Sequence, residues 1–251
     1  MKGRVRKVLS AFLAVVLILT FSTSVFASNT STSQPETISA TAITAISTPE
    51  NYEAWLKNES KTEDVSKAST TRETLATFQK LTKEQKKKFV DLLQNEELIV
   101  SALTVDVKPG ESKSLSNGEV VVSLNKTVES ELSPLISTAG TVEYRKATYQ
   151  RTVSFFGIPV FQTTSWVKYS HNGIIILAIQ GYNHFTSINY NPTLATSWSG
   201  LTGWYSTQTA YSTGDIVFSF LIEGYGLVYG SAEVGVWGDV YNDAGGWVTE
   251  Y

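Results

Sequence analysis

The spacing of apolar and polar residues changes near residue 105, and the two patterns predict different secondary structures. Between residues 49 and 104 apolar residues recur at helical spacing. One such run is Leu75, Phe78 and Leu81. Thr82 and Gln85 then have the spacing of a capping box at the start of the next helix. The pattern predicts two or three short helices over 49–104, which form too small a core alone and therefore pack on the rest of the chain.

From residue 105 to residue 251 the chain alternates between short β-type runs and turn signals. The runs are rich in Val, Ile, Thr, Tyr, Phe and Trp, which are the residue types that favour strands. The turn signals are Gly-containing pairs, such as Pro109-Gly110, Asn117-Gly118 and Asn172-Gly173. We therefore predict a mainly β fold, an antiparallel β-sandwich over residues 105–251 preceded by the small helical segment.

Two turn signals predict how the strands between Thr148 and Phe185 pair. Asn172-Gly173 suits a two-residue type I′ turn, and Gly157-Ile158 suits a type II′ turn with glycine first. Because the register decides which side chains share a face, these two turns divide the residues between two faces. The face predicted to be the core carries Tyr149, Arg151, Val153, Phe155, Val160, Trp166, Leu177, Ile179, Gly181 and Phe185.

The predicted core face is expected to pack against a second sheet. The facing strands are expected to contribute Phe218, Phe220, Val234 and Val236. Small residues alternate along the last of these strands, which suits close packing of sheets; the alternative is the insertion hairpin of a pore-forming protein. Arg151 is expected to stack on Trp166 or Tyr149.

The opposite face of the same strands is polar and, in this register, uncharged. Its candidate ligand-binding residues are Phe161, Tyr169, Gln180, Tyr182 and His184, with Thr163 and Ser165 beside them. Thr and Tyr are common on solvated sheets, so one interpretation is an ordinary exposed surface. The other is a flat platform of hydroxyls and aromatic rings that binds a polysaccharide or the edge of a partner protein.

The first 27 residues have the pattern of an export signal. Four basic residues precede the apolar run Val8–Phe21, and small residues lead up to Ala27. The apolar run is shorter than the ~20 residues that span a bilayer. We therefore expect cleavage near Ala27 and a secreted, extracellular protein. Residues 28–48, rich in Ser and Thr, are predicted to form a flexible leader.

The composition excludes several kinds of chemistry. The chain has no Cys, so it has neither disulfides nor a thiol nucleophile, and its net charge of −3 argues against nucleic-acid binding. The two histidines, His171 and His184, lie too far apart in the predicted register to share a metal ion. No Gly-x-Ser-x-Gly motif is present. No cofactor is expected.

Oxygen-bearing side chains suggest two further hypotheses. Asp239, Asn242 and Asp243 could supply ligands to a calcium ion, although an ordinary turn explains the same residues. A glycan hydrolase needs two carboxylates about 5 to 9.5 Å apart. Such a pair could form between strands, for example Glu233 with Asp215. Nothing in the sequence selects that pair, so no catalytic residue is assigned.

These observations favour a secreted, non-catalytic β-sandwich protein that acts as a binding or interaction module at the cell envelope or outside the cell. The expected partner is a cell-envelope polysaccharide or another protein. The alternative is a membrane-active protein, toxin-like or antimicrobial, as the insertion-hairpin interpretation would imply. A small glycan hydrolase is the third hypothesis.

Overall fold

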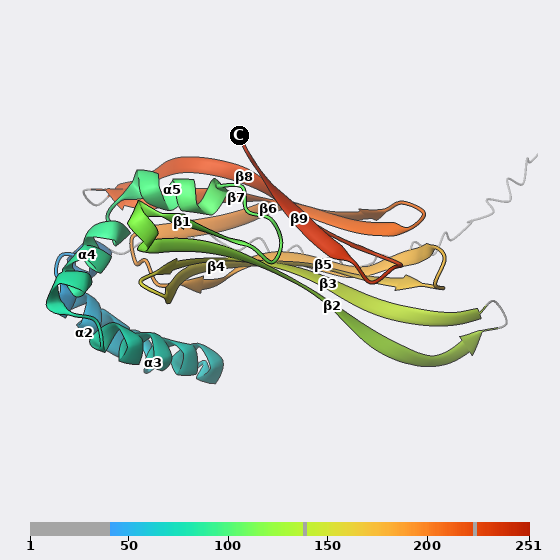
Figure 1. The fold of residues 1–251 in the computed structure, drawn as a ribbon, viewed down its shortest axis with the longest axis horizontal. Coiled ribbons are helices and arrows are strands. Elements are labelled where there is room, and N and C mark those ends of the chain that lie inside the picture. Colours follow the sequence, from blue (N-terminus) through green and yellow to red (C-terminus); the bar gives the residue numbers. More distant parts are fainter. Residues whose placement is uncertain (1–40, 138–139, 223–224) are drawn as a thin grey trace, which may run out of the picture. The chain divides into compact units, whose positions relative to one another are not determined.

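Two antiparallel sheets follow a set of short helices in the computed structural model, which describes residues 41–137, 140–222 and 225–251 (Figure 1). Sheet A has the strand order β1-β2-β3-β4-β5, and sheet B has the order β6-β7-β8-β9. The sheets face each other, because β3 and β4 contact β8 while β5 contacts β7. The predicted mainly β sandwich with a helical segment before it is confirmed.

The described elements have the following bounds. The helices are α1 (Thr41–Ala45), α2 (Pro49–Glu59), α3 (Val65–Gln79), α4 (Lys83–Leu93), α5 (Glu96–Thr104) and the 3-10 turn η1 (Ser116–Gly118). The strands of sheet A are β1 (Ser112–Leu115), β2 (Val120–Ser137), β3 (Gly140–Phe155), β4 (Ile158–His171) and β5 (Ile176–Asn189). The strands of sheet B are β6 (Leu194–Tyr205), β7 (Thr209–Ile222), β8 (Tyr225–Asp239) and β9 (Ala244–Glu250). All of them belong to one compact unit within residues 32–251.

Helices α2 to α5 begin at polar capping residues. Thr82 and Gln85 form the predicted capping box at the start of α4, since each side chain accepts a hydrogen bond from the other's backbone N–H. Residues 41–48, predicted to be part of a flexible leader, instead form α1 and the N-cap of α2. That prediction is wrong for this stretch because Ile46 is buried in the core. The predicted export signal and residues 28–40 lie outside the described residues.

Aromatic contacts join the helical segment to sheet A. Phe89 of α4 lies 5.2 Å from Phe78 of α3 and 5.6 Å from Phe155 of β3, ring centre to ring centre, in edge-to-face geometry. The hydroxyl of Tyr52 donates to the carbonyl of Tyr190 at 2.8 Å. The predicted packing of the helices on the β region is therefore confirmed.

Arg151 of β3 connects sheet A to α5. Its buried guanidinium donates to the carbonyl of Ala102 at 3.0 Å and to that of Val105. These carbonyls lie at the end of α5, where backbone oxygens lack helical partners. Burial lowers the pKa of Arg151 to about 10. The predicted stacking of Arg151 on Trp166 is wrong, because the two side chains lie on opposite faces of sheet A, whereas the alternative partner Tyr149 lies on the same buried face as Arg151.

The turn between β3 and β4 sets the register differently from the prediction. Phe156 and Gly157 both have positive φ, 50° and 79°, so these two residues form the turn and Phe155 pairs with Ile158. Val160 is then an extra residue in β4, because the next pair is Val153 with Phe161. As a result Tyr149 faces Ser165, one position away from the predicted Trp166.

The turn between β4 and β5 is also longer than predicted. It spans residues 172–175, and His171 pairs with Ile176. The Asn172 side-chain oxygen accepts from the N–H groups of Ile174 and Ile175, which shapes a wider loop than a type I′ turn. Further irregularities in the β4–β5 ladder shift the register again.

The shifted register exchanges the faces over much of β4 and β5, because side chains alternate along a strand, whereas Val160 and Ile179 lie in or against the core as predicted. The core face is correct for β3, where Tyr149, Arg151, Val153 and Phe155 are buried, and for the facing Phe218, Phe220, Val234 and Val236. It is wrong for Trp166, Leu177 and Phe185, which point outward. Trp166 is half-buried, lies against Gly181 and has the Lys146 ammonium 5.4 Å from its ring.

Substitutions on the two faces of β4 test this register. We expect Tyr169→Ala, which empties a fully buried site, to lower the free energy of unfolding by on the order of 3 to 5 kcal/mol. We expect Trp166→Ala to lower it by only about 1 kcal/mol, since a half-exposed ring and one cation–π contact are lost. Urea unfolding measures both values. A larger loss for Trp166→Ala would contradict the register.

Candidate functional site

The five residues predicted to bind a ligand do not lie together on an exposed face. Phe161, Tyr169 and His184 are buried between the sheets. Tyr182 is half-buried, and its ring lies where a side chain on Gly203 of sheet B would be. Gln180 points to the outer side of sheet A and donates to the Ser170 hydroxyl at 3.0 Å. The platform predicted on β4 and β5 is thus turned toward the interior, as the register requires.

The polar residues of that inner face form hydrogen bonds between the sheets. The two ring nitrogens of His184 lie 2.8 Å from the hydroxyl of Ser165 in sheet A and 2.7 Å from that of Ser212 in sheet B. The Tyr169 hydroxyl donates to the Asp239 carbonyl at 2.8 Å. Burial lowers the pKa of His184 to about 4 and raises that of Tyr169 to about 12. These residues align the two sheets.

The calcium candidates Asp239, Asn242 and Asp243 form the loop between β8 and β9. One carboxylate oxygen of Asp239 accepts from the N–H groups of Tyr241 and Asp243, both at 2.8 Å. The Asp243 carboxylate accepts from its neighbouring backbone and from Lys126. Within the described ranges, no group of three or more acidic or histidine side chains could hold a metal ion. The geometry is that of a loop closed by its own side chains.

An unpredicted aromatic row crosses the outer face of sheet B. Ser212 points inward to His184, so its neighbour Tyr211 points outward. Tyr211 pairs with Trp204 of β6 on one side and with Trp237 of β8 on the other. The Trp204 and Tyr211 rings are stacked, 5.4 Å apart at an angle of 12°. Trp204 is 43% exposed, so the row is open to solvent at the edge strand.

Two tryptophans of this face lie flat over glycines of the neighbouring strand. Trp237 pairs with Gly245, and Gly235 pairs with Trp247. A Cβ atom on Gly245 would lie 2.7 Å from the Trp237 ring, and one on Gly235 would lie 2.2 Å from the Trp247 ring. Only glycine permits such close approach, so the two rings rest on the backbone of the neighbouring strand and stay partly exposed.

Two carboxylates lie directly opposite each other beside the aromatic rings. Asp215 of β7 pairs with Glu233 of β8, which places their Cβ atoms about 4.5 to 5.5 Å apart. Trp247 donates its ring N–H to Glu233 at 3.0 Å, and Tyr251 forms a hydrogen bond with Asp215. Partial desolvation and the two carboxylates raise the pKa of Tyr251. Like charges directly opposite each other destabilise a sheet.

We define the aromatic face as the outer face of sheet B around these rings and carboxylates. Its residues are Ser199, Thr202, Trp204, Tyr211, Thr213, Asp215, Glu233, Gly235, Trp237, Gly245 and Trp247. It can offer flat apolar area, the exposed hydroxyl groups of Ser199 and Thr202, and two strong hydrogen-bond acceptors to one ligand. Neither Asp215 nor Glu233 forms a salt bridge with Lys or Arg in the described part of the chain.

A short repeated motif could have revealed this face from the sequence. Gly-x-Trp occurs at 235–237 and again at 245–247. Two antiparallel strands with this motif place each Trp over the other strand's Gly when the register is reciprocal. The sequence offers Glu233 with Asp215 as one possible carboxylate pair, and the strand register is what brings the two together.

Comparison with protein-family models, curated proteins and solved structures found no significant match to this chain. No helix in the described part of the chain is both long and apolar enough to cross a membrane. Function is therefore inferred from the residues themselves.

The buried His184 generates a prediction about pH. Its folded-state pKa of about 4 lies below the ordinary 6.5, so between these values the unfolded chain binds a proton that the folded chain does not. This contribution to stability is complete above pH 6.5 and falls as pH drops toward 4, by on the order of 3 kcal/mol in total. We expect His184→Gln to lose less stability than the wild type between pH 7 and pH 4.5 in urea unfolding.

The carboxylates titrate in both the wild type and His184→Gln, so their contribution to the loss of stability cancels when the two are compared. Parallel stability losses in wild type and His184→Gln would show that His184 is not held neutral between the sheets.

Proposed function

We propose that this protein is a secreted β-sandwich binding module whose aromatic face binds an extended neutral glycan, such as a polysaccharide of the cell envelope. The observation that carries the proposal is the pair of tryptophans, Trp237 and Trp247, lying flat over glycines next to Asp215 and Glu233. Flat aromatic rings and uncharged hydroxyl groups match the two kinds of surface on a sugar ring.

The two carboxylates fit a ligand that donates hydrogen bonds. Sugar hydroxyl groups donate to carboxylates in short, charge-assisted hydrogen bonds, which are stronger than neutral ones. A bound polyol would also separate the negative charges of Asp215 and Glu233 from each other by its own donors. The ligand would relieve the repulsion between the two carboxylates. Because this repulsion destabilises the free sheet, its relief would favour the bound state.

The length of the aromatic row favours a chain of sugars over a single sugar. Paired positions run from Trp204 through Tyr211 and Trp237 to Gly245 across four strands. Three steps of about 4.8 Å between strands give a row of about 14 Å. The basic and apolar start of the sequence supports export, which would bring this face to extracellular polymers.

Sedimentation with an insoluble cell-wall glycan tests the proposal. We expect the wild type to sediment and Trp237→Ala and Trp247→Ala to remain in the supernatant, with a loss of affinity of at least about tenfold. Trp166→Ala is the matched control, because it removes a half-buried Trp from the outer face of the other sheet. Circular dichroism checks that each variant is folded.

Three outcomes would contradict this proposal. One is a wild type that stays in the supernatant with every glycan tried. Another is equal loss of binding for Trp166→Ala. The third is release of soluble reducing sugars that depends on Asp215 and Glu233, which would instead assign hydrolysis to this pair.

Removing one charge of the carboxylate pair distinguishes its role in glycan binding from its effect on stability. We expect Asp215→Asn to raise the free energy of unfolding by up to about 0.5 kcal/mol, because it removes the repulsion from Glu233. The same substitution should weaken glycan binding by roughly tenfold, because a charged acceptor is lost. Thermal unfolding and the sedimentation assay measure the two effects. The exposed Glu111→Gln serves as the control, and a destabilised Asp215→Asn that binds normally would contradict a role in binding.

A further inference from the structure

Three loops lie together at one end of the sandwich. They are the β4–β5, β6–β7 and β8–β9 loops, at residues 172–175, 206–208 and 240–243. The N–H of Ile176 donates to the carbonyl of Thr207 at 2.8 Å, and the N–H of Val240 donates to the carbonyl of Gln208 at 3.1 Å. The loops of both sheets are therefore tied to one another by backbone hydrogen bonds.

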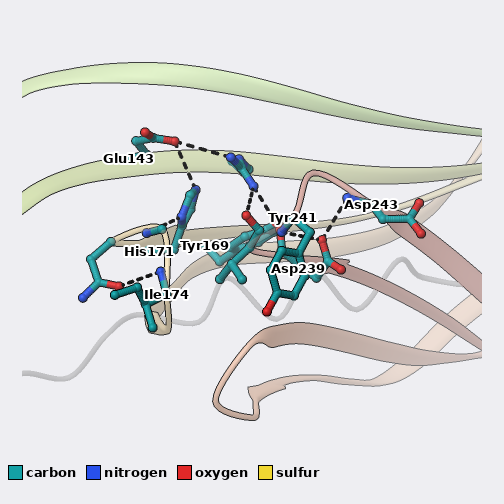
Figure 2. A network of polar contacts seen from close by, with 11 residues as sticks. Glu143, Tyr169, His171, Ile174, Asp239, Tyr241 and Asp243 are labelled. Carbon is teal, nitrogen blue, oxygen red and sulfur yellow. Dashed lines mark hydrogen bonds and ion pairs between the residues drawn. The ribbon is translucent and has the colours of Figure 1, made fainter.

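Large apolar and aromatic side chains project into solvent at this end. We call four of them the tip: Ile174 (69% exposed), Ile175 (37%), Tyr205 (50%) and Tyr241 (69%). Figure 2 shows Ile174 and Tyr241 on their two loops beside the polar network at the loop bases. The Tyr241 hydroxyl accepts from the Gln208 amide at 2.6 Å, which joins two of the loops through side chains.

The backbone N–H groups of three tip residues, Ile174, Ile175 and Tyr241, are already paired within their own loops. The Asn172 side chain accepts from the N–H groups of Ile174 and Ile175 at 3.0 and 2.9 Å. The Asp239 carboxylate accepts from the N–H of Tyr241 at 2.8 Å. Moving an unpaired N–H out of water costs several kcal/mol, and these groups avoid that cost. The tip is thus suited to an apolar environment as well as to water.

A network of polar contacts at the bases of the loops holds the tip in place. The Arg145 guanidinium donates to the carbonyls of Asp239 and Val240 at 3.2 and 2.7 Å and lies 3.4 Å from the Glu143 carboxylate (Figure 2). His171 is fully buried 3.5 Å from the same carboxylate. The loops therefore need little further ordering when they meet a partner.

The charges around the tip include no excess of positive charge, because the Asp239 carboxylate adds a negative charge to two ion pairs. Arg145 faces Glu143, and Lys126 faces Asp243. Burial and the nearby Arg145 lower the pKa of His171, so it adds no positive charge at neutral pH. A surface without cationic excess gains nothing from anionic lipids, whereas Ile side chains with neighbouring Tyr hydroxyls match the boundary between acyl chains and headgroups.

We propose that the tip inserts into the interface of a zwitterionic phospholipid bilayer. Ile174 and Ile175 enter the acyl-chain boundary, and Tyr205 and Tyr241 place their hydroxyls among the headgroups. The tip consists of loop residues and Tyr205 at the end of β6, and none of them belongs to the aromatic face, so this proposal does not depend on glycan binding.

Flotation of the chain from Ser28 onward with phosphatidylcholine vesicles tests the proposal, since all described elements lie within that part of the chain. We expect the wild type to float with the vesicles, equally at low and high salt. Ile174→Ser combined with Tyr241→Ser should lower the partition coefficient by at least about tenfold. Val65→Ser is the matched control, because Val65 is 78% exposed on α3.

A spectroscopic readout tests the site of contact independently. Tyr241→Trp should give fluorescence that is quenched by vesicles brominated on their acyl chains, and Val65→Trp should not. The proposal is overturned by a wild type that does not float, by equal flotation of the double variant, or by equal quenching of the two Trp variants. It is also overturned if the tip residues instead mediate a dimer that forms without vesicles and is lost in the double variant.

Discussion

The register of β4 in sheet A is the constraint on which the rest of the structure depends. Phe156 and Gly157 close the β3–β4 turn with positive φ, and the extra residue Val160 then shifts every later pair of the ladder. Because side chains alternate, this one residue decides which face of β4 meets sheet B. It turns a row of hydroxyl groups inward, among them that of Ser165, which contacts His184. It also turns Tyr169 inward and Trp166 outward.

The resulting interior contains polar side chains that form hydrogen bonds to the other sheet or to the helices. His184 lies between the hydroxyls of Ser165 and Ser212, and Arg151 lies on the last carbonyls of α5. Such contacts contribute modest net stability, but each costs free energy when its partner is displaced, so they select one alignment of the sheets and the helices. That alignment leaves the outer face of sheet B uncovered around Trp204 and brings the three tip loops together.

Features set by local sequence could be predicted, and features set by register could not. The capping box at Thr82, the change from helical to strand spacing near residue 105 and the small inward side of β8 all depend on neighbouring residues. The bulge at Val160 and the wide loop after His171 carry no comparable signal, since the same glycines allow several turns. The predicted ligand residues were therefore placed on the wrong side of sheet A. The sequence offers several possible carboxylate pairs, and only the strand register places Asp215 opposite Glu233.

The claim that sheet B carries the ligand face is tested most directly by nuclear magnetic resonance of the six indole N–H groups during titration with a soluble cell-wall oligosaccharide. Each tryptophan reports from a different place, so the spectrum locates the contact without any substitution. The resonances predicted to shift are those of Trp204, Trp237 and Trp247. Those predicted to stay are Trp55, Trp166 and Trp198. Shifts confined to Trp166, or a spectrum unchanged at saturating oligosaccharide, would contradict the assignment of the aromatic face.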